Sequence, residues 1–284
     1  MRETPGGKQS PGAKQRPGAK REGERRRLQL KVAVWATAEE AADRAGDPTL
    51  PSQCAVVIDV LRATSTIVAA LAAGAAGVIP VLTPEEARAL ARTMPGGHVI
   101  LGGERKAVRI PGFDLGNSPR EYRAEEVGGK TIILTTTNGT RAVHAASAAA
   151  RVLMGAILNA SAVARAVIRE GRDVVIVCAG TRGSFSLEDT LAAGVILEAL
   201  PGAADAEGYD LEADYDDLSL AALAIAGHYA GRFDEALRWT HHGMDLEALG
   251  FAADLDYCAR LDAVPVVPVW SDGVIRLRMG EGAD

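Results

Sequence analysis

Two segments place many polar side chains directly after a mainly apolar run. Asp59–Thr66 offers a carboxylate, a guanidinium and three hydroxyls after the run Cys54–Ile58. Thr135–Thr140 offers hydroxyls, an amide and a glycine after the run Lys130–Leu134. Hydroxyls with consecutive backbone N–H groups bind phosphate or sulfonate oxygens, and a carboxylate can hold a divalent cation. The two segments therefore indicate chemistry on a small anion, although helix capping accounts for some of the hydroxyls.

A third segment, Cys178–Asp189, follows another apolar run and offers a thiol, an arginine and two adjacent carboxylates. Neighbouring residues on a helix point about 100° apart, so Glu188 and Asp189 are not expected to face one site together. Ser186 and Asp189 fit a variant of the capping box, which makes one of the two carboxylates a cap.

A fourth segment, Gly102–Arg105, puts a carboxylate and a guanidinium beside two glycines and leads to Gly112–Pro119. Arg105 is a candidate anion ligand. His241 and His242 have no evident partners in the sequence, and we expect ordinary surface or core histidines there.

Short runs rich in valine and isoleucine alternate with alanine- and leucine-rich stretches of helical spacing. The predicted strands are Leu28–Trp35, Cys54–Ile58, Gly77–Leu82, His98–Leu101, Lys130–Leu134, Arg151–Met154, Asp173–Val177 and Val264–Val269. The predicted helices are Thr66–Ala73, Pro84–Arg92, Thr140–Ala149, Ala160–Arg169, Leu187–Leu200, Leu218–Tyr229, Phe233–Arg238 and Leu255–Leu261. An acidic stretch, Asp205–Asp217, separates the two groups of helices, and a hairpin is expected around Ser271–Gly273.

This alternation predicts an α/β fold in which a mostly parallel or mixed sheet is flanked by helices, in three layers α/β/α. In open parallel sheets, ligands bind beyond the carboxyl ends of the strands, where helix N-termini favour anions. The polar segments all follow predicted strands, so we expect them to converge.

Composition divides the chain into a basic tail, residues 1–27, and a folded domain, residues 28–284, with room for two α/β lobes and a cleft. The tail holds nine Lys/Arg and three Glu with almost no large apolar side chain, and is expected to be disordered. Without the tail the chain carries 22 basic and 34 acidic residues, a formal charge of −12. An acidic domain argues against specific nucleic-acid binding.

No secretory signal follows the basic tail and no run is apolar enough to span a bilayer, so we expect a cytoplasmic protein that does not contact membranes. The cysteines, Cys54, Cys178 and Cys258, are odd in number and widely spaced, which supports neither disulfides nor structural zinc. The sequence leaves the oligomeric state open, a homo-oligomer included.

Five segments in this order resemble the 2-phosphosulfolactate phosphatase (ComB) family across residues 30–270. They are Ile58–Thr66, Gly103–Arg105, Gly112–Pro119, Thr135–Thr140 and Cys178–Gly180 with Phe185–Asp189. The resemblance implies a magnesium-dependent phosphoric monoester hydrolase that converts 2-phospho-3-sulfolactate to sulfolactate and phosphate, on a route toward coenzyme M. The implied partner is a small anionic phosphorylated substrate.

On this interpretation each polar segment has an expected role. Asp59 with Glu188 or Asp189 would hold Mg²⁺, and Glu104 is a reserve ligand. The expected catalytic residues are Asp59, Arg62, Glu104 and Cys178. The expected substrate-binding residues are Thr64, Ser65, Arg105, Thr137, Asn138, Gly139, Thr140, Gly180 and Arg182.

Two other interpretations stay open at this point. Cys178 could act as a covalent nucleophile with Arg182 assisting the phosphate, because a thiol at a helix N-terminus can have a lowered pKa. Alternatively, the protein could be a non-catalytic sensor of a phosphorylated or sulfonated metabolite. Carboxylates in the binding loops argue against the sensor, since without a cation they would repel an anion.

Overall fold

The computed structural model of this chain describes residue 1, residues 25–94 and residues 98–277. The predicted tail falls almost wholly outside these residues. The first strand, β1 (Arg26–Trp35), begins slightly before the boundary that the sequence predicts. No helix in the described ranges is long and apolar enough to cross a membrane.

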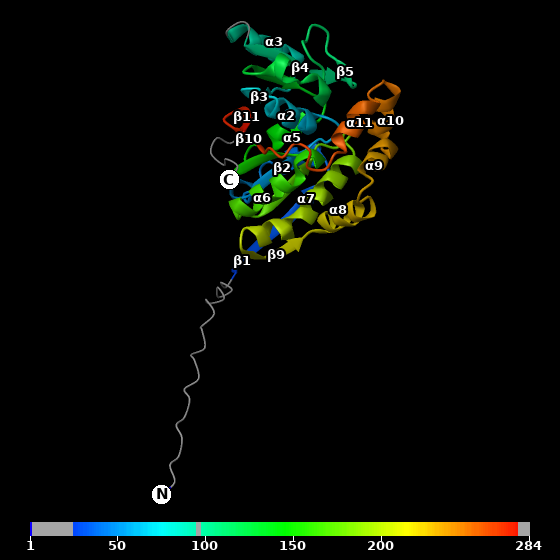
Figure 1. The fold of residues 1–284 in the computed structure, drawn as a ribbon. Helices are drawn as coiled ribbons and strands as arrows, with labels where there is room; N and C mark the ends of the chain where they lie inside the picture. Colours follow the sequence, from blue (N-terminus) through cyan, green and yellow to red (C-terminus); the bar gives the residue numbers. More distant parts are fainter. Residues whose placement is uncertain (2–24, 95–97, 278–284) are drawn as a thin grey trace.

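The described residues form one mixed 11-stranded sheet, in the order β5-β4-β6-β3-β11-β10-β7-β2-β8-β1-β9. Figure 1 shows β4 and β5 at one end and β1 and β9 at the other. The remaining strands are β2 (Cys54–Ile58), β3 (Gly77–Pro80), β4 (Val99–Arg105), β5 (Val108–Arg109), β6 (Thr131–Thr135), β7 (Arg151–Gly155), β8 (Val174–Cys178), β9 (Tyr209–Tyr215), β10 (Pro268–Ser271) and β11 (Val274–Leu277).

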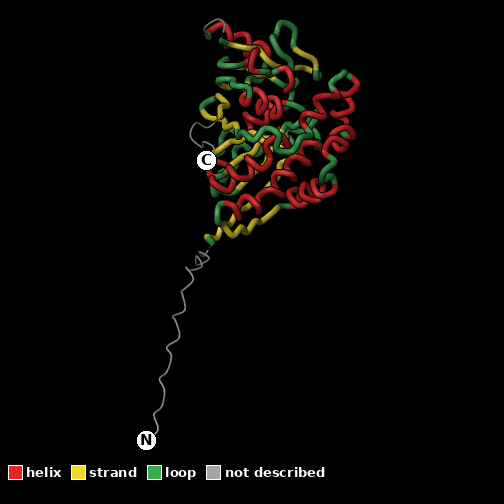
Figure 2. Tube along the Cα trace, viewed as in Figure 1, coloured by secondary structure: helices red, strands yellow, loops and turns green. Residues whose placement is uncertain are grey.

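Helices pack along the strands over the whole body, as Figure 2 shows. They are α1 (Ala38–Asp43), α2 (Ala63–Ala72), α3 (Pro84–Thr93), α4 (Ala124–Val127), α5 (Gly139–Ala146), α6 (Ala160–Glu170), α7 (Leu187–Ala206), α8 (Asp217–His228), α9 (Phe233–Trp239), α10 (His241–Ala248) and α11 (Ala252–Cys258). The α/β prediction is confirmed.

Successive side chains of the central strands point to opposite faces of the sheet, and each face is covered by helices, which gives three layers. In β2, every residue is buried: Val56 packs into a core shared with α6, α7 and α8, whereas Val57 packs into a second core shared with α1 and α5. A strand that is apolar on both faces requires helices on both sides of the sheet. The prediction of a sheet with helices on both faces is therefore confirmed.

The predicted hairpin around Ser271–Gly273 occupies the middle of the sheet. Strands β10 and β11 pair antiparallel with each other and with β7 and β3, so they join two parallel blocks that run in opposite directions. One block is β4-β6-β3 and the other is β7-β2-β8-β1-β9. Neighbouring strands rotate by about 20–25°, so the blocks are far from coplanar. The loops that follow β2 and β6 meet, with Gly139 lying against Asp59.

The sequence-based prediction missed one strand and placed the start of another wrongly. The acidic stretch Asp205–Asp217 contains strand β9, which pairs parallel with β1 because Tyr209, Leu211, Ala213 and Tyr215 turn toward the core and the acidic residues between them face solvent. The predicted strand Val264–Val269 pairs only from Pro268 onward. Both errors arise where long-range pairing decides the local structure.

Candidate functional site

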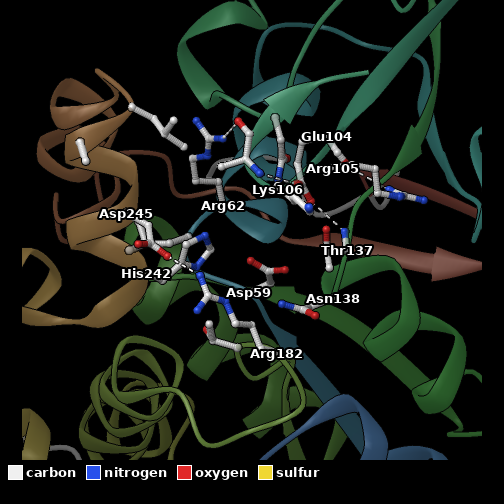
Figure 3. Close-up of a pocket in the computed structure, with 16 residues that line it drawn as sticks. Asp59, Arg62, Glu104, Arg105, Lys106, Thr137, Asn138, Arg182, His242 and Asp245 are labelled. Atoms are coloured by element: carbon white, nitrogen blue, oxygen red, sulfur yellow. Dashed lines mark hydrogen bonds and ion pairs between the residues drawn. The ribbon is translucent and has the colours of Figure 1, made fainter. Parts of the chain in front are cut away.

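A cavity of about 850 Å³ opens where the loops after β2, β6 and β8 meet the β4–β5 turn and helix α10. Figure 3 shows Asp59 at its centre, with Thr137 and Asn138 on one side and His242 and Asp245 on the other. Five segments that are far apart in the sequence thus converge on one space, and four of them are the polar segments that were expected to meet.

Asp59 follows the last residue of β2 and is 8% exposed. Its Oδ1 accepts a hydrogen bond from the backbone N–H of Ala63 at 3.1 Å. Burial, with the negative charges of Glu104 and Glu188, raises the pKa of Asp59 to about 6, although His242 and the Ala63 N–H oppose the shift. A buried carboxylate at this position is primed to accept a proton or a cation.

His242 lines the cavity from α10, and its Nδ1 lies 3.5 Å from Glu188 Oε1. Burial lowers the pKa of His242, but the Glu188 and Asp59 carboxylates raise it more, and the net shift is upward. Glu188 itself is buried, yet the nearby histidine brings the net pKa shift of its carboxyl downward. The expectation that His242 has no partner was wrong.

Asp189 joins two of the converging loops. Its Oδ1 accepts from the Val60 N–H at 2.9 Å, after β2, and its Oδ2 accepts from the Gly180 N–H at 3.0 Å, after β8. Burial, with Asp59 and Glu188, raises the pKa of the Asp189 carboxyl well above its ordinary value. Ser186 caps α7 by accepting from the Asp189 N–H.

Glu104 has the same kind of arrangement on the other side of the cavity. One carboxylate oxygen accepts from the Thr137 N–H at 2.8 Å and the other from the Ala107 N–H at 2.8 Å. The side chain therefore ties the β4–β5 turn to the β6–α5 loop. Neighbouring Arg105 donates to Thr135 Oγ1 and to the Leu82 carbonyl, each at 3.0 Å.

Arg62 lines the cavity but is almost completely buried. Its Nη1 pairs with Asp254 at 2.6 Å, its Nη2 donates to the Ala107 carbonyl at 3.1 Å, and its guanidinium lies over the Phe251 ring. Among the residues that the structure describes, no three His, Cys, Asp or Glu side chains cluster as a ready-made metal site.

Comparison with known proteins decides the family. The family model described as 2-phosphosulpholactate phosphatase matches residues 41–273. The chain belongs to this family. A probable 2-phosphosulfolactate phosphatase of Symbiobacterium thermophilum is 47% identical over 228 residues, which cover 80% of this chain and 95% of the relative. A second, of Caldanaerobacter subterraneus subsp. tengcongensis, is 43% identical over 237 residues, which cover 84% and 95%.

Within this phosphatase family member, the hydroxyls predicted to bind substrate fall into two groups. Thr137 lines the cavity, as does the Asn138 side chain. Thr64, Ser65 and Thr140 are buried and donate to backbone carbonyls of their own loops. They are not helix caps: α2 and α5 begin after Arg62 and Asn138, neither of which makes a side-chain cap bond, and the three hydroxyls instead hold their own strand-to-helix loops in shape.

Three further groups were missed or left unassigned by the sequence analysis. Lys106 is exposed and lines the cavity from the β4–β5 turn. Asn117 also lines it, and its buried Oδ1 has no hydrogen-bond partner within the described residues. Asp245 lines it from α10 and pairs with Arg182 at 2.7 Å. Lys106 and Asn117 lie inside family segments or beside them, which is the signal that could have found them.

Cys178 does not line the cavity and is fully buried. Burial, together with Asp189, raises the pKa of its thiol well above the ordinary value, which disfavours the thiolate that a nucleophile requires. We expect Cys178→Ser to keep kcat within a few-fold of the wild type while losing some stability to the buried hydroxyl. Cys258→Ser, at another fully buried thiol, is the matched control, and phosphate-release kinetics on both variants provide the check. Loss of turnover in the Cys178 variant alone would support the thiol mechanism.

Gly139 is the first residue of α5, and a Cβ there would lie 2.4 Å from Ala63 Cβ and 2.6 Å from Asp59 Oδ2. We expect Gly139→Ala to destabilise the protein by about 1–3 kcal/mol, as overpacking does, and to reduce turnover by displacing Asp59. Gly202→Ala is the control, because a Cβ at that position in α7 meets nothing within 4 Å. Alanine in an open helical position stabilises by up to about 1 kcal/mol, so urea unfolding should show opposite signs for the two variants.

Proposed function

We propose that this chain hydrolyses 2-phospho-3-sulfolactate, or a closely related small phosphoester, to the free hydroxy acid and phosphate with the help of Mg²⁺. The observation that carries the proposal is the buried carboxylate of Asp59 in a cavity that is otherwise rich in hydrogen-bond donors and cations. The names of the relatives supply the substrate.

The donors that support an anionic substrate come from separate loops. Lys106, Arg105 and Arg182 bring positive charge to the cavity, and Thr137 and Asn138 bring neutral donors. Charge-assisted hydrogen bonds of this kind are about twice as strong as neutral ones. An ester with phosphate, sulfonate and carboxylate on three carbons would use all of them.

The residues present fit a magnesium ion. Mg²⁺ is usually held by one or two carboxylates together with waters and substrate oxygens. Within the described ranges the Ala63 N–H bonds Asp59 Oδ1 and leaves Oδ2 for a ligand, and the buried Asn117 Oδ1 has no hydrogen-bond partner there. We assign Asp59 as the direct ligand. Glu188 would act through water, because its side chain already contacts Thr181 and His242.

Asp189 and Glu104 have a different part in this proposal. Both oxygens of each carboxylate accept backbone N–H groups, so these side chains fix the loops that carry the ligands. A buried carboxylate with two backbone donors is a rigid tie between segments. Their predicted role as metal ligands is thereby replaced by one of positioning.

The reaction needs a water to add to phosphorus while the ester P–O bond breaks, which yields phosphate and a hydroxyl on the hydroxy acid. Bound Mg²⁺ would neutralise phosphoryl oxygens and activate that water. The Asp59 carboxylate would hold the cation beside the phosphoryl group. The opposite charges of His242 and Glu188 would balance each other next to Asp59. Lys106, Arg105 and Arg182 would keep the substrate oriented. Several groups must converge, because losing one donor typically costs only about 10²–10³-fold in rate.

The test is phosphate release from racemic 2-phospho-3-sulfolactate, measured with Mg²⁺ or with EDTA, beside phospholactate and phosphoglycerate. Magnesium-dependent release that favours the sulfonated ester supports the reaction, the cofactor and the substrate. Release from another ester only would keep the phosphatase chemistry and discard the substrate. Binding of these esters without release would support the sensor interpretation instead.

A further inference from the structure

The turn between β4 and β5 has an unusual backbone. Lys106 and Ala107 form a two-residue turn, and both have positive φ, at 53° and 63°. Such turns normally use asparagine or glycine, because a Cβ makes the left-handed conformation unfavourable. Two non-glycine residues in this conformation indicate that the surrounding structure holds them there, and that pattern is typical of functional sites.

Two buried charged side chains hold this turn in place. Glu104 accepts from the Ala107 N–H at 2.8 Å, and Arg62 donates to the Ala107 carbonyl at 3.1 Å. Glu104 is 6% exposed and Arg62 is 2% exposed. The backbone N–H and the backbone carbonyl of Ala107 are therefore each bound by a side chain that lines the cavity. The turn is fixed relative to the Thr137 loop through Glu104 and relative to α11 through Arg62.

The fixed turn brings the Lys106 side chain to the cavity. Lys106 makes no hydrogen bond or ion pair with any residue in the described ranges, although it lines the cavity. The neighbouring arginines each have a side-chain partner: Arg62 pairs with the buried Asp254 carboxylate, Arg182 pairs with Asp245 at the surface, and Arg105 donates to the neutral Thr135 hydroxyl. In Figure 3, Lys106 lies on the side of Glu104 and Arg105, across the cavity from Arg182. An uncommitted ammonium group at that place lacks an anion.

We propose that Lys106 contacts the sulfonate of the substrate and sets the preference for a sulfonated ester. The proposal rests on the proposed function. Asp59 and its cation would take the phosphoryl group, so Lys106 is left for a group that is not transferred. A planar carboxylate matches the fork of an arginine, whereas a tetrahedral sulfonate is suited to the three donors of an ammonium point charge. Lys106 is thus a specificity-determining residue.

The test compares two substrates in two variants. In Lys106→Met, kcat/KM for 2-phospho-3-sulfolactate should fall about 10- to 100-fold, the range expected for one hydrogen bond to a charged group. kcat/KM for phospholactate, which lacks the sulfonate, should stay within about threefold, and Lys106→Arg should recover part of the loss. Lys31→Met is the matched control: it removes an exposed lysine of β1 that does not line the cavity, and neither substrate should respond.

An equal fall for both substrates would overturn the sulfonate assignment and place Lys106 at the phosphoryl or carboxylate group. No change for either would remove Lys106 from the binding site. If the wild type releases phosphate from neither ester, the proposed reaction fails, and the contact is then judged by calorimetry with sulfolactate and lactate. A loss of about tenfold in sulfolactate affinity in Lys106→Met, with lactate unchanged, would still support it, and unchanged sulfolactate affinity would refute it.

Discussion

Asp59→Asn is expected to lower kcat by at least about 10³-fold and, in the metal-free protein at pH 7.5, to raise stability. The loss of turnover follows because the variant lacks the charge that holds the cation beside the phosphoryl group. The gain in stability follows because Asp59 is buried beside Glu104 and Glu188, so its ionisation opposes folding. Asparagine keeps an oxygen that can accept the Ala63 N–H, so the loop itself should persist.

The sign of the pH effect follows from the raised pKa. Between the ordinary value of 3.8 and the folded value of about 6, the folded state binds the Asp59 proton more tightly than the unfolded state does. The wild type therefore loses stability as pH rises through this window, by up to about 3 kcal/mol for a shift of about two pKa units. Asp59→Asn should be the more stable protein above pH 6 and gain nothing below pH 4.

Urea unfolding in EDTA at pH 4 and pH 7.5 measures the stability difference, and phosphate release with Mg²⁺ measures turnover. Asp210→Asn is the control, because Asp210 is exposed on the edge strand β9. Surface changes of this kind stay within about 0.5 kcal/mol. If Asp59→Asn is destabilised at pH 7.5, the carboxylate contributes to folding and the functional assignment loses its physical basis.

The elements of the fold were readable because their signals are local. Strand β2 is apolar at all five positions, and such a run between helical stretches predicts a doubly covered sheet. Asp59 and Thr137 were found because each follows such a strand. Strand order was not readable, because the hairpin β10-β11 is inserted between two blocks that are distant from it in the sequence.

The residues that were missed depend on tertiary contacts. His242 lies on α10 and meets Glu188 only because α10 packs over the loop after β8. Asp189 and Glu104 look like metal ligands in the sequence, since no pattern shows that backbone N–H groups will occupy both oxygens of each. Lys106 is singled out by its positive φ, and the dipeptide Lys-Ala does not predict that backbone conformation.

Arg62→Met is expected to cost about 3–5 kcal/mol of stability, which is typical of breaking a buried ion pair by removing one partner. The Arg62 and Asp254 side chains are each 2% exposed, and among the residues described only Ser118 Oγ would still donate to the Asp254 carboxylate. The double variant Arg62→Met/Asp254→Leu should regain most of the loss, because it removes the stranded charge. Urea unfolding of both single variants and the double variant gives the coupling energy.

Arg182→Met is the matched control for this cycle. It breaks an arginine–aspartate pair at the same cavity, but Arg182 and Asp245 are 80% and 52% exposed. Exposed pairs contribute about 0–1 kcal/mol, so the stability of Arg182→Met should barely change.

Comparing the stability and the substrate binding of Arg62→Met separates two roles of Arg62. If Arg62→Met keeps its stability and instead weakens substrate binding, Arg62 is an anion ligand. If stability falls as expected, the guanidinium chiefly holds the Ala107 carbonyl and α11 in place, and the anion-binding charge comes from Lys106, Arg105 and Arg182 around it.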